Sequence, residues 1–65
     1  MEMQIEKDCV TIDGTIVISA IKIHNGRWRW YSSIWQIDGK KTYKTSENAI
    51  KAAVNKMKAV GHLTA

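Results

Sequence analysis

The most strongly patterned stretch of the chain is residues 27–37, Arg-Trp-Arg-Trp-Tyr-Ser-Ser-Ile-Trp-Gln-Ile, which holds all three tryptophans and both arginines. Aromatic and β-branched residues suit the pleated, half-buried surface of a sheet, so this stretch is predicted to be the central strand. Successive side chains of a strand point to opposite faces. Trp28 and Trp30 are therefore expected on one face, and Arg27, Arg29 and Tyr31 on the other.

Three short turn signals divide the first two thirds of the chain: Asp13-Gly14, Asn25-Gly26 and Asp38-Gly39. A type I′ turn needs positive φ at both central residues, which Asp, Asn and Gly tolerate, so each pair predicts a two-residue hairpin turn. Three such hairpins in series predict a four-stranded antiparallel β-meander. Its strands are expected within residues 4–12, 15–24, 27–37 and 40–45.

Two-residue turns also determine which residues face each other across the sheet. The turn at residues 25–26 places Ile21 opposite Trp30, and the turn at residues 38–39 places Ile34 opposite Tyr43. Because opposite residues share a face, the first face is expected to be the core, formed by Val17, Ile21, Ile23, Trp28, Trp30, Ile34 and Tyr43. The second face collects Lys22, His24, Arg27, Arg29, Tyr31, Trp35, Lys40, Thr42 and Lys44, with Ile16 and Ile18 toward one end.

The last third of the chain has the spacing of a helix, predicted over residues 46–60. Thr45 or Ser46 suits the N-terminal cap, Glu47 lies in the first turn, and Gly61 is the stop signal. Apolar residues recur three and four positions apart: Ala49, Ile50, Ala53, Val54, Met57 and Val60. This stripe needs an apolar partner, and the first sheet face is the one available. The prediction is a single α+β domain over residues 1–65, a meander with one C-terminal helix packed on one face.

The net charge of +4 is unevenly distributed along the chain. Residues 1–13 carry four acidic residues and one lysine, whereas residues 14–65 carry nine basic and two acidic residues. A localised positive field favours polyanions or acidic protein surfaces as partners. The body of the domain is therefore expected to contact such a partner.

Several classes of function lack a sequence signal. No apolar stretch is long enough for a transmembrane helix, and the N-terminus lacks the basic and apolar regions of a signal peptide. With the lone Cys9, these features favour a cytoplasmic protein without membrane association. Cys9, His24 and His62 lack the close paired spacing of metal ligands. No nucleophile–base arrangement or glycine-rich phosphate loop is recognisable, so no catalytic residues and no cofactor are expected.

The second face is the candidate binding surface, and its proposed contact residues are Lys22, Arg27, Arg29, Tyr31, Trp35, Lys40 and Lys44. Arginine can donate two hydrogen bonds to guanine in the major groove, lysine pairs with phosphate, and aromatic rings can stack on unpaired bases. An alternative interpretation is that the basic residues form a solvated face. Trp35 would then be covered by the first strand, by a bulge or by a second subunit.

Three segments carry a resemblance to known DNA-binding domains: Gly26 to Trp30, Asp38 to Lys41 and Tyr43 to Ala49. They resemble the arm-type domains at the N-termini of tyrosine integrases and, more distantly, the plant ethylene-response-factor domain. Those families share a G-x-W strand start, a turn with G-K, and an aromatic-x-T-x-x-x-A entry into a C-terminal helix. The resemblance implies a sheet in the major groove, with Arg27, Arg29, Tyr31 and Trp35 on the DNA-facing strand and Lys40 and Lys44 beside it.

The chain also departs from those families. They typically have a three-stranded sheet, which leaves the acidic first strand unaccounted for, and a recombinase domain, which is not expected to follow the helix here. The expectation is therefore a standalone accessory DNA-binding protein of a phage or mobile element. The alternative is a phage-type inhibitor, such as an anti-CRISPR or another host-takeover factor, that docks on a host protein complex through the same face. Tyr, Trp and Arg also dominate protein interfaces, and a homodimer is compatible with either hypothesis.

Overall fold

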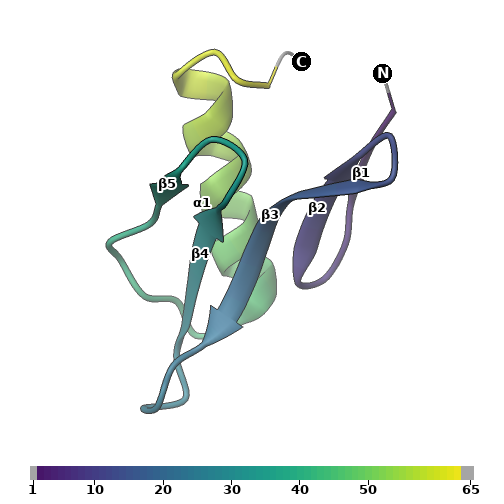
Figure 1. Ribbon diagram of the computed structural model, residues 1–65. Coiled ribbons are helices and arrows are strands. Elements are labelled where there is room, and N and C mark those ends of the chain that lie inside the picture. Colours follow the sequence, from purple (N-terminus) through teal and green to yellow (C-terminus); the bar gives the residue numbers. More distant parts are fainter. Residues whose placement is uncertain (1, 64–65) are drawn as a thin grey trace.

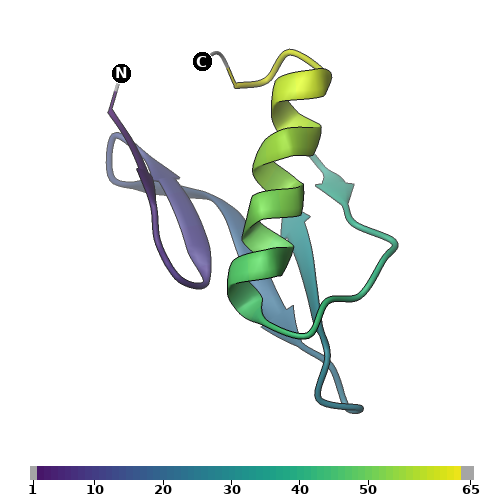
Figure 2. The ribbon, with the colours of Figure 1, turned by 180° about the vertical axis from the view of Figure 1, so that it is seen from behind.

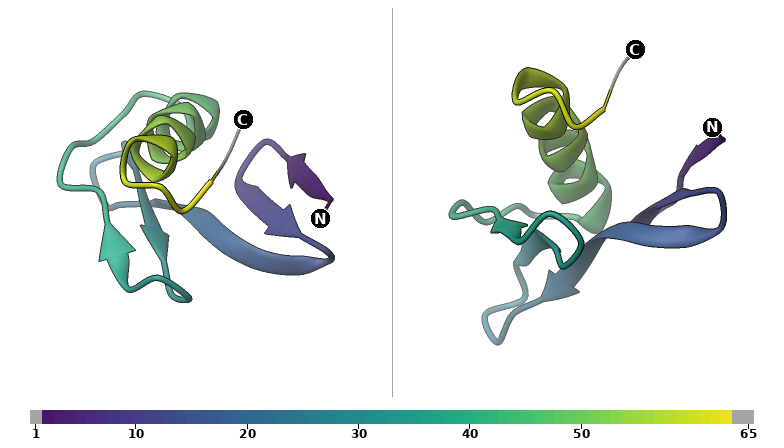
Figure 3. Two further views of the ribbon diagram at one scale, coloured as in Figure 1. Left: turned by 90° about the horizontal axis from the view of Figure 1, so that it is seen from above. Right: turned by 45° about the horizontal axis from the view of Figure 1, so that its top comes forward.

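A computed structural model describes residues 2–63 and shows an antiparallel five-stranded sheet with one helix on one face (Figure 1). The strands follow each other in chain order: β1 (Met3–Ile5), β2 (Cys9–Ile12), β3 (Thr15–Lys22), β4 (Trp28–Ser32) and β5 (Ile37–Asp38). Helix α1 (Ser46–Ala59) crosses β3 and β4, and the β1–β2 hairpin lies beside it (Figures 2 and 3). The α+β class is confirmed, whereas the count of four strands was wrong.

The extra strand arises within residues 4–12, which were predicted to be one strand. The chain turns back after Ile5, and the Glu6 N–H donates to the Cys9 carbonyl at 2.8 Å. Ile5 then pairs with Val10, so the segment forms a hairpin of its own. The intervening residues 6–8 are all charged and do not alternate in polarity, which suits a turn better than a strand.

The turn at Asp13-Gly14 is the one hairpin that follows the prediction closely. Both residues have positive φ, 50° and 83°, and Ile12 pairs directly with Thr15. Farther along β2 and β3 the pairing shifts, since Val10 faces Ile18 while Thr11 faces Ile16. Val17 is the extra residue of this β-bulge.

The bulge has a consequence for the core. It interrupts the alternation of β3, so that the adjacent residues Val17 and Ile18 are both buried. Placing Ile18 on the second face was therefore wrong. Strict alternation cannot describe a strand that carries an extra residue.

The hairpin at Asn25-Gly26 forms with a different register from the one expected. Only Gly26 has positive φ, and the Ile23 N–H donates to the Arg27 carbonyl at 2.8 Å, so residues 24–26 form a three-residue loop. The Asn25 side chain accepts from the Arg27 N–H at 3.1 Å and stabilises this loop.

The longer loop moves every pair in this hairpin by one residue. Trp30 faces Ala20, and Arg29 faces Ile21. Ile21 therefore lies on the face away from the helix, not in the core as predicted.

The predicted strand over residues 27–37 ends early. It stops at Ser32, the chain turns at residues 33–36, and Ile37 returns to pair with Ser32. Ile34 lies in this turn and is exposed, so its assignment to the core was wrong. The positive φ of Gln36, 55°, shows that the reversal occurs here and not at Asp38-Gly39.

Residues 40–45 do not form the predicted strand. Residues 39–44, here called the edge segment, follow the outer edge of β4 and pair with it only locally. The Gly39 N–H donates to the Trp30 carbonyl at 2.9 Å, and Tyr43 exchanges two hydrogen bonds with Trp28 at 2.8 and 2.9 Å. Gly39 is buried, and a Cβ at this position would overlap the indole of Trp30. Its role is close approach and not turn formation.

Helix α1 begins and ends almost as the sequence indicates. The Thr45 hydroxyl accepts from the Asn48 N–H at 3.1 Å, and Gly61 has φ 86° beyond the last turn. Ala49, Ile50, Ala53, Val54 and Met57 are buried against the sheet. Val60 is 46% exposed, so its place in the predicted stripe was wrong, and Leu63 enters the core instead at 3% exposure.

Candidate nucleic-acid interface

The face of β3, β4 and β5 that points away from α1 is here called the open face. The strand register places Ile21 beside Arg29 and Tyr31 beside Asp38 on this face. Ile21 is 45% exposed and Tyr31 is 40% exposed. Arg27 lies on the same side of β4, since Trp28 and Trp30 point toward the helix. The register shift therefore brings Ile21 onto the open face.

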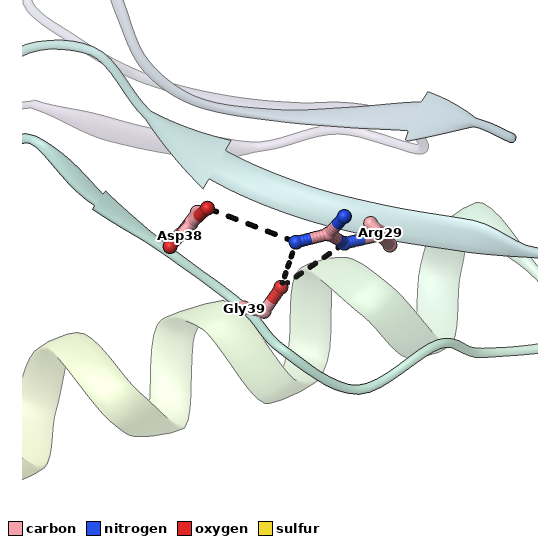
Figure 4. Close-up of polar contacts among 3 residues, drawn as sticks. All are labelled: Arg29, Asp38 and Gly39. Atoms are coloured by element: carbon pink, nitrogen blue, oxygen red, sulfur yellow. Dashed lines mark hydrogen bonds and ion pairs between the residues drawn. The ribbon is translucent and has the colours of Figure 1, made fainter.

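The two arginines are engaged within the molecule. Arg29 donates from Nε and Nη2 to the Gly39 carbonyl at 3.2 and 3.1 Å, and its Nη2 lies 3.7 Å from Asp38 Oδ2 (Figure 4). Arg27 donates from Nε to the Thr42 hydroxyl at 2.7 Å and from Nη2 to the Thr42 carbonyl at 3.0 Å. Together these contacts, here called the arginine clamp, fasten the edge segment to β4.

The clamp explains why the edge segment needs few strand hydrogen bonds. Charged donors form stronger hydrogen bonds than neutral ones, and each guanidinium presents two parallel N–H groups. Arg27 and Arg29 thereby satisfy backbone carbonyls that a regular strand would pair with N–H groups. Contact with a guanine edge by the same Nε and Nη2 atoms would require the clamp to open.

The predicted lysines lie outside the open face. Lys40 and Lys44 are exposed on the edge segment. Lys22 pairs across the sheet with Trp28 and so points to the helix side at the end of β3. The structure brings Arg27, Arg29 and Tyr31 together as expected. Lys40 and Lys44 lie on the edge segment that the two arginines contact, whereas Lys22 lies on the helix side.

Trp35 occupies the turn between β4 and β5, and it is half-buried. Its ring stacks on His62 with centroids 4.8 Å apart and an interplanar angle of 5°. The backbone N–H of Trp35 also donates to the Ser32 hydroxyl at 3.2 Å. The chain that follows α1 therefore covers Trp35, and not the first strand, a bulge or a second subunit as expected. Placing its side chain on the second face was wrong.

Two basic residues near the predicted set were missed. Lys41 and Lys56 join Lys40 around a groove of about 520 Å³ between the edge segment and α1. Lys41 is adjacent to Lys40 in the sequence, and this adjacency could have added it to the predicted contact residues. Lys56 follows Ala52 by one helical turn at the border of the apolar stripe, and only the packing of α1 brings it to the edge segment.

The other titratable and polar groups add little to a site. Partial burial raises the pKa of the Cys9 thiol, and the hydrogen bond to Glu6 and the nearby charges of Glu6 and Asp8 raise it further, which keeps the thiol protonated. Residues 2–63 contain no cluster of three His, Cys, Asp or Glu side chains positioned for a metal. Within the same residues, no helix combines the length and apolar character needed to cross a bilayer.

No protein-family model, no curated protein and no solved structure matches this chain. The resemblance to arm-type DNA-binding domains is therefore untested and stays a prediction.

Proposed function

We propose that the protein is a non-enzymatic nucleic-acid-binding module that contacts the phosphate backbone mainly through lysines near the β5 side of the sheet. The observation that carries the proposal is that the lysines are exposed and not paired with carboxylates of the described residues. All eight lie within residues 2–63, all are exposed, and none forms an ion pair with a carboxylate of those residues. Exposed, unneutralised ammonium groups are what phosphate contacts require.

The arrangement of the sheet concentrates this charge. The acidic residues Glu2, Glu6 and Asp8 belong to the β1–β2 hairpin at one side, whereas Lys40, Lys41 and Lys44 lie on the edge segment at the other (Figure 1). Separation of opposite charges across a small domain gives one side a positive potential that attracts a polyanion. The acidic hairpin would be held away from the phosphates.

The arginine clamp favours binding that does not depend on the nucleotide sequence. Arg27 and Arg29 are the residues best suited to sequence-specific contacts, and both use Nε and Nη2 within the molecule. Lysine contacts to phosphate carry no sequence information. The proposal is therefore sequence-tolerant binding, and the resemblance to integrase arm-type domains is the basis for assigning it to an accessory protein of a phage or mobile element.

The test is a titration of fluorescein-labelled duplex and single-stranded DNA with the protein at about 50 and 200 mM salt. Roughly four to six phosphate contacts give a log–log salt slope of about −4 to −5 on duplex DNA. Lys44→Glu is expected to weaken binding about tenfold, because it removes a phosphate contact and adds a repulsive charge.

Lys7→Glu is the matched control, since it makes the same charge change on the acidic hairpin and is expected to alter affinity less than about threefold. Absence of binding at the lower salt would refute the proposal. Equal losses in Lys7→Glu and Lys44→Glu would show that net charge, and not the edge segment, determines the affinity.

A second candidate function follows from the open face. Ile21 and Tyr31 are large, exposed side chains at diagonal positions of β3 and β4, and Arg29 lies directly opposite Ile21. Aromatic and arginine anchors of this kind dominate protein interfaces, which favours a protein-binding inhibitor such as an anti-CRISPR. Co-elution with purified CRISPR interference complexes, lost in Tyr31→Ala and retained in Lys44→Glu, is the result expected for this function. Failure to co-elute with any complex tested would leave it without support.

A further inference from the structure

The groove between α1 and the edge segment has two walls from distant parts of the sequence. Lys40 and Lys41 come from the edge segment, and Ala52 and Lys56 come from the helix. Between β5 and α1 the chain bows outward from the helix (Figure 2). The groove volume of about 520 Å³ falls within the range of about 300–1,000 Å³ found for small-molecule sites.

The charge inside this groove is strongly positive. Three of its lining residues are lysines, and the one acidic residue that borders it is Asp38. Asp38 Oδ2 lies 3.7 Å from Arg29 Nη2, so its negative charge is already paired (Figure 4). An anion entering the groove meets three ammonium groups and a carboxylate whose charge is offset.

The groove also has an aromatic surface. Trp30 and Tyr43 line it, and Trp30 is 4% exposed while Tyr43 is half-buried. Gly39 adds no side chain and lies directly on the indole of Trp30. Aromatic rings beside lysines are the combination with which proteins hold single-stranded nucleic acids, since bases stack on rings while phosphates pair with cations.

We infer that this groove binds one nucleotide of a single-stranded nucleic acid, with phosphates held by Lys41 and Lys56 and the base against Tyr43. The inference rests on the proposed function and specifies its ligand. A single strand presents unpaired bases that can enter a groove of this size. A duplex keeps its bases stacked inside and is too wide to enter, so it contacts only the outer lysines.

The experiment compares a fluorescein-labelled oligothymidylate of about 12 nucleotides, within the ~4–16 nucleotides that small single-strand-binding domains cover, with a duplex of the same length. Lys56→Glu is the groove variant. Lys58→Glu is the matched control, because it makes the same charge change on the same helix outside the groove lining. Both side chains are exposed, and near-ultraviolet circular dichroism checks that each variant is folded.

The single strand is expected to bind more tightly than the duplex. Lys56→Glu is expected to weaken single-strand binding about tenfold and to lower the magnitude of the salt slope by about 0.7, whereas Lys58→Glu changes affinity less than about threefold. Backbone amide shifts on titration are expected to concentrate at Gly39 through Tyr43.

The remaining outcomes separate this inference from the proposed function. Tighter binding of the duplex, or equal losses in Lys56→Glu and Lys58→Glu, would overturn the groove while leaving nucleic-acid binding intact. Absence of binding to both DNAs at about 50 mM salt would refute nucleic-acid binding itself, and the groove inference with it.

Discussion

At the scale of single residues, Gly39 and its neighbours show how a contact determines a residue's role. Gly39 lies against the indole of Trp30, leaving no room for a Cβ, while its carbonyl accepts two hydrogen bonds from Arg29. Its N–H donates to the Trp30 carbonyl. The same Asp-Gly pair that predicts a turn in the sequence is therefore the point where the edge segment is fastened to β4.

Gly39→Ala is expected to lower the free energy of unfolding by about 1–3 kcal/mol, because the new methyl group overlaps the Trp30 ring. For a domain of this size each kcal/mol lowers the melting temperature by about 4–8 °C. The near-ultraviolet circular dichroism of the tryptophans is expected to change as well.

Gly26→Ala provides the comparison, since Gly26 has φ 80° and nothing within 4 Å of its Cβ position. It is expected to cost about 1–2 kcal/mol through backbone strain alone and to leave the tryptophan spectrum unchanged. An unchanged melting temperature and spectrum in Gly39→Ala would contradict the close contact.

At the scale of elements, helix α1 is defined by its two ends. Thr45 caps the N-terminus through its hydroxyl, and Glu47 in the first turn complements the helix dipole. At the C-terminus, the Gly61 N–H donates to the Lys58 carbonyl at 3.2 Å and the His62 N–H to the Met57 carbonyl at 2.9 Å. This Schellman arrangement reverses the chain direction and directs His62 and Leu63 back toward the sheet.

Thr45→Ala is expected to lower the free energy of unfolding by about 1 kcal/mol, because the Asn48 N–H loses its acceptor. Thr45→Ser keeps the hydroxyl and is expected to restore most of that stability. Urea denaturation measured by far-ultraviolet circular dichroism gives both values. Equal stabilities of Thr45→Ala and Thr45→Ser would mean that the hydroxyl does not cap the helix.

At the scale of the whole molecule, the core is closed by parts of the chain that lie far apart in the sequence. Val10 from β2, Trp30 from β4, Met57 from α1 and Leu63 beyond it belong to one buried cluster. A chain of 65 residues has little apolar area to spare, so each closing residue contributes a large share of its marginal stability.

Leu63→Ala is expected to lower the free energy of unfolding by about 2–4 kcal/mol, since it opens a cavity at a residue that is 3% exposed. Val60→Ala, at a residue that is 46% exposed, is expected to change it by less than about 0.5 kcal/mol. Thermal denaturation compares the two variants. A larger loss of stability in Val60→Ala than in Leu63→Ala would mean that Val60 belongs to the core, as helical spacing predicted.

The outline of the fold was accessible from local patterns. Helix α1 was predicted within one residue at its C-terminus, and the Asp13-Gly14 turn and the core positions of Trp28 and Trp30 were also anticipated. These features depend on residues close together in the sequence: a cap, a turn dipeptide, an alternation. Of the candidate site, the sequence indicated that Arg27, Arg29 and Tyr31 share one face. It did not indicate the internal hydrogen bonds of the two arginines.

Local chemistry thus determined the class of fold, the helix and the presence of a basic, aromatic region. Tertiary structure decided the register of β3 against β4 and the close contact of Gly39 with Trp30. It also decided the stacking of His62 on Trp35 and the position of Lys41 and Lys56 around one groove. The physical reason is that one residue more or less in a loop costs little locally but moves every following side chain to the other face. Which alternative forms depends on the packing of the whole core, and that packing involves residues distant in the sequence.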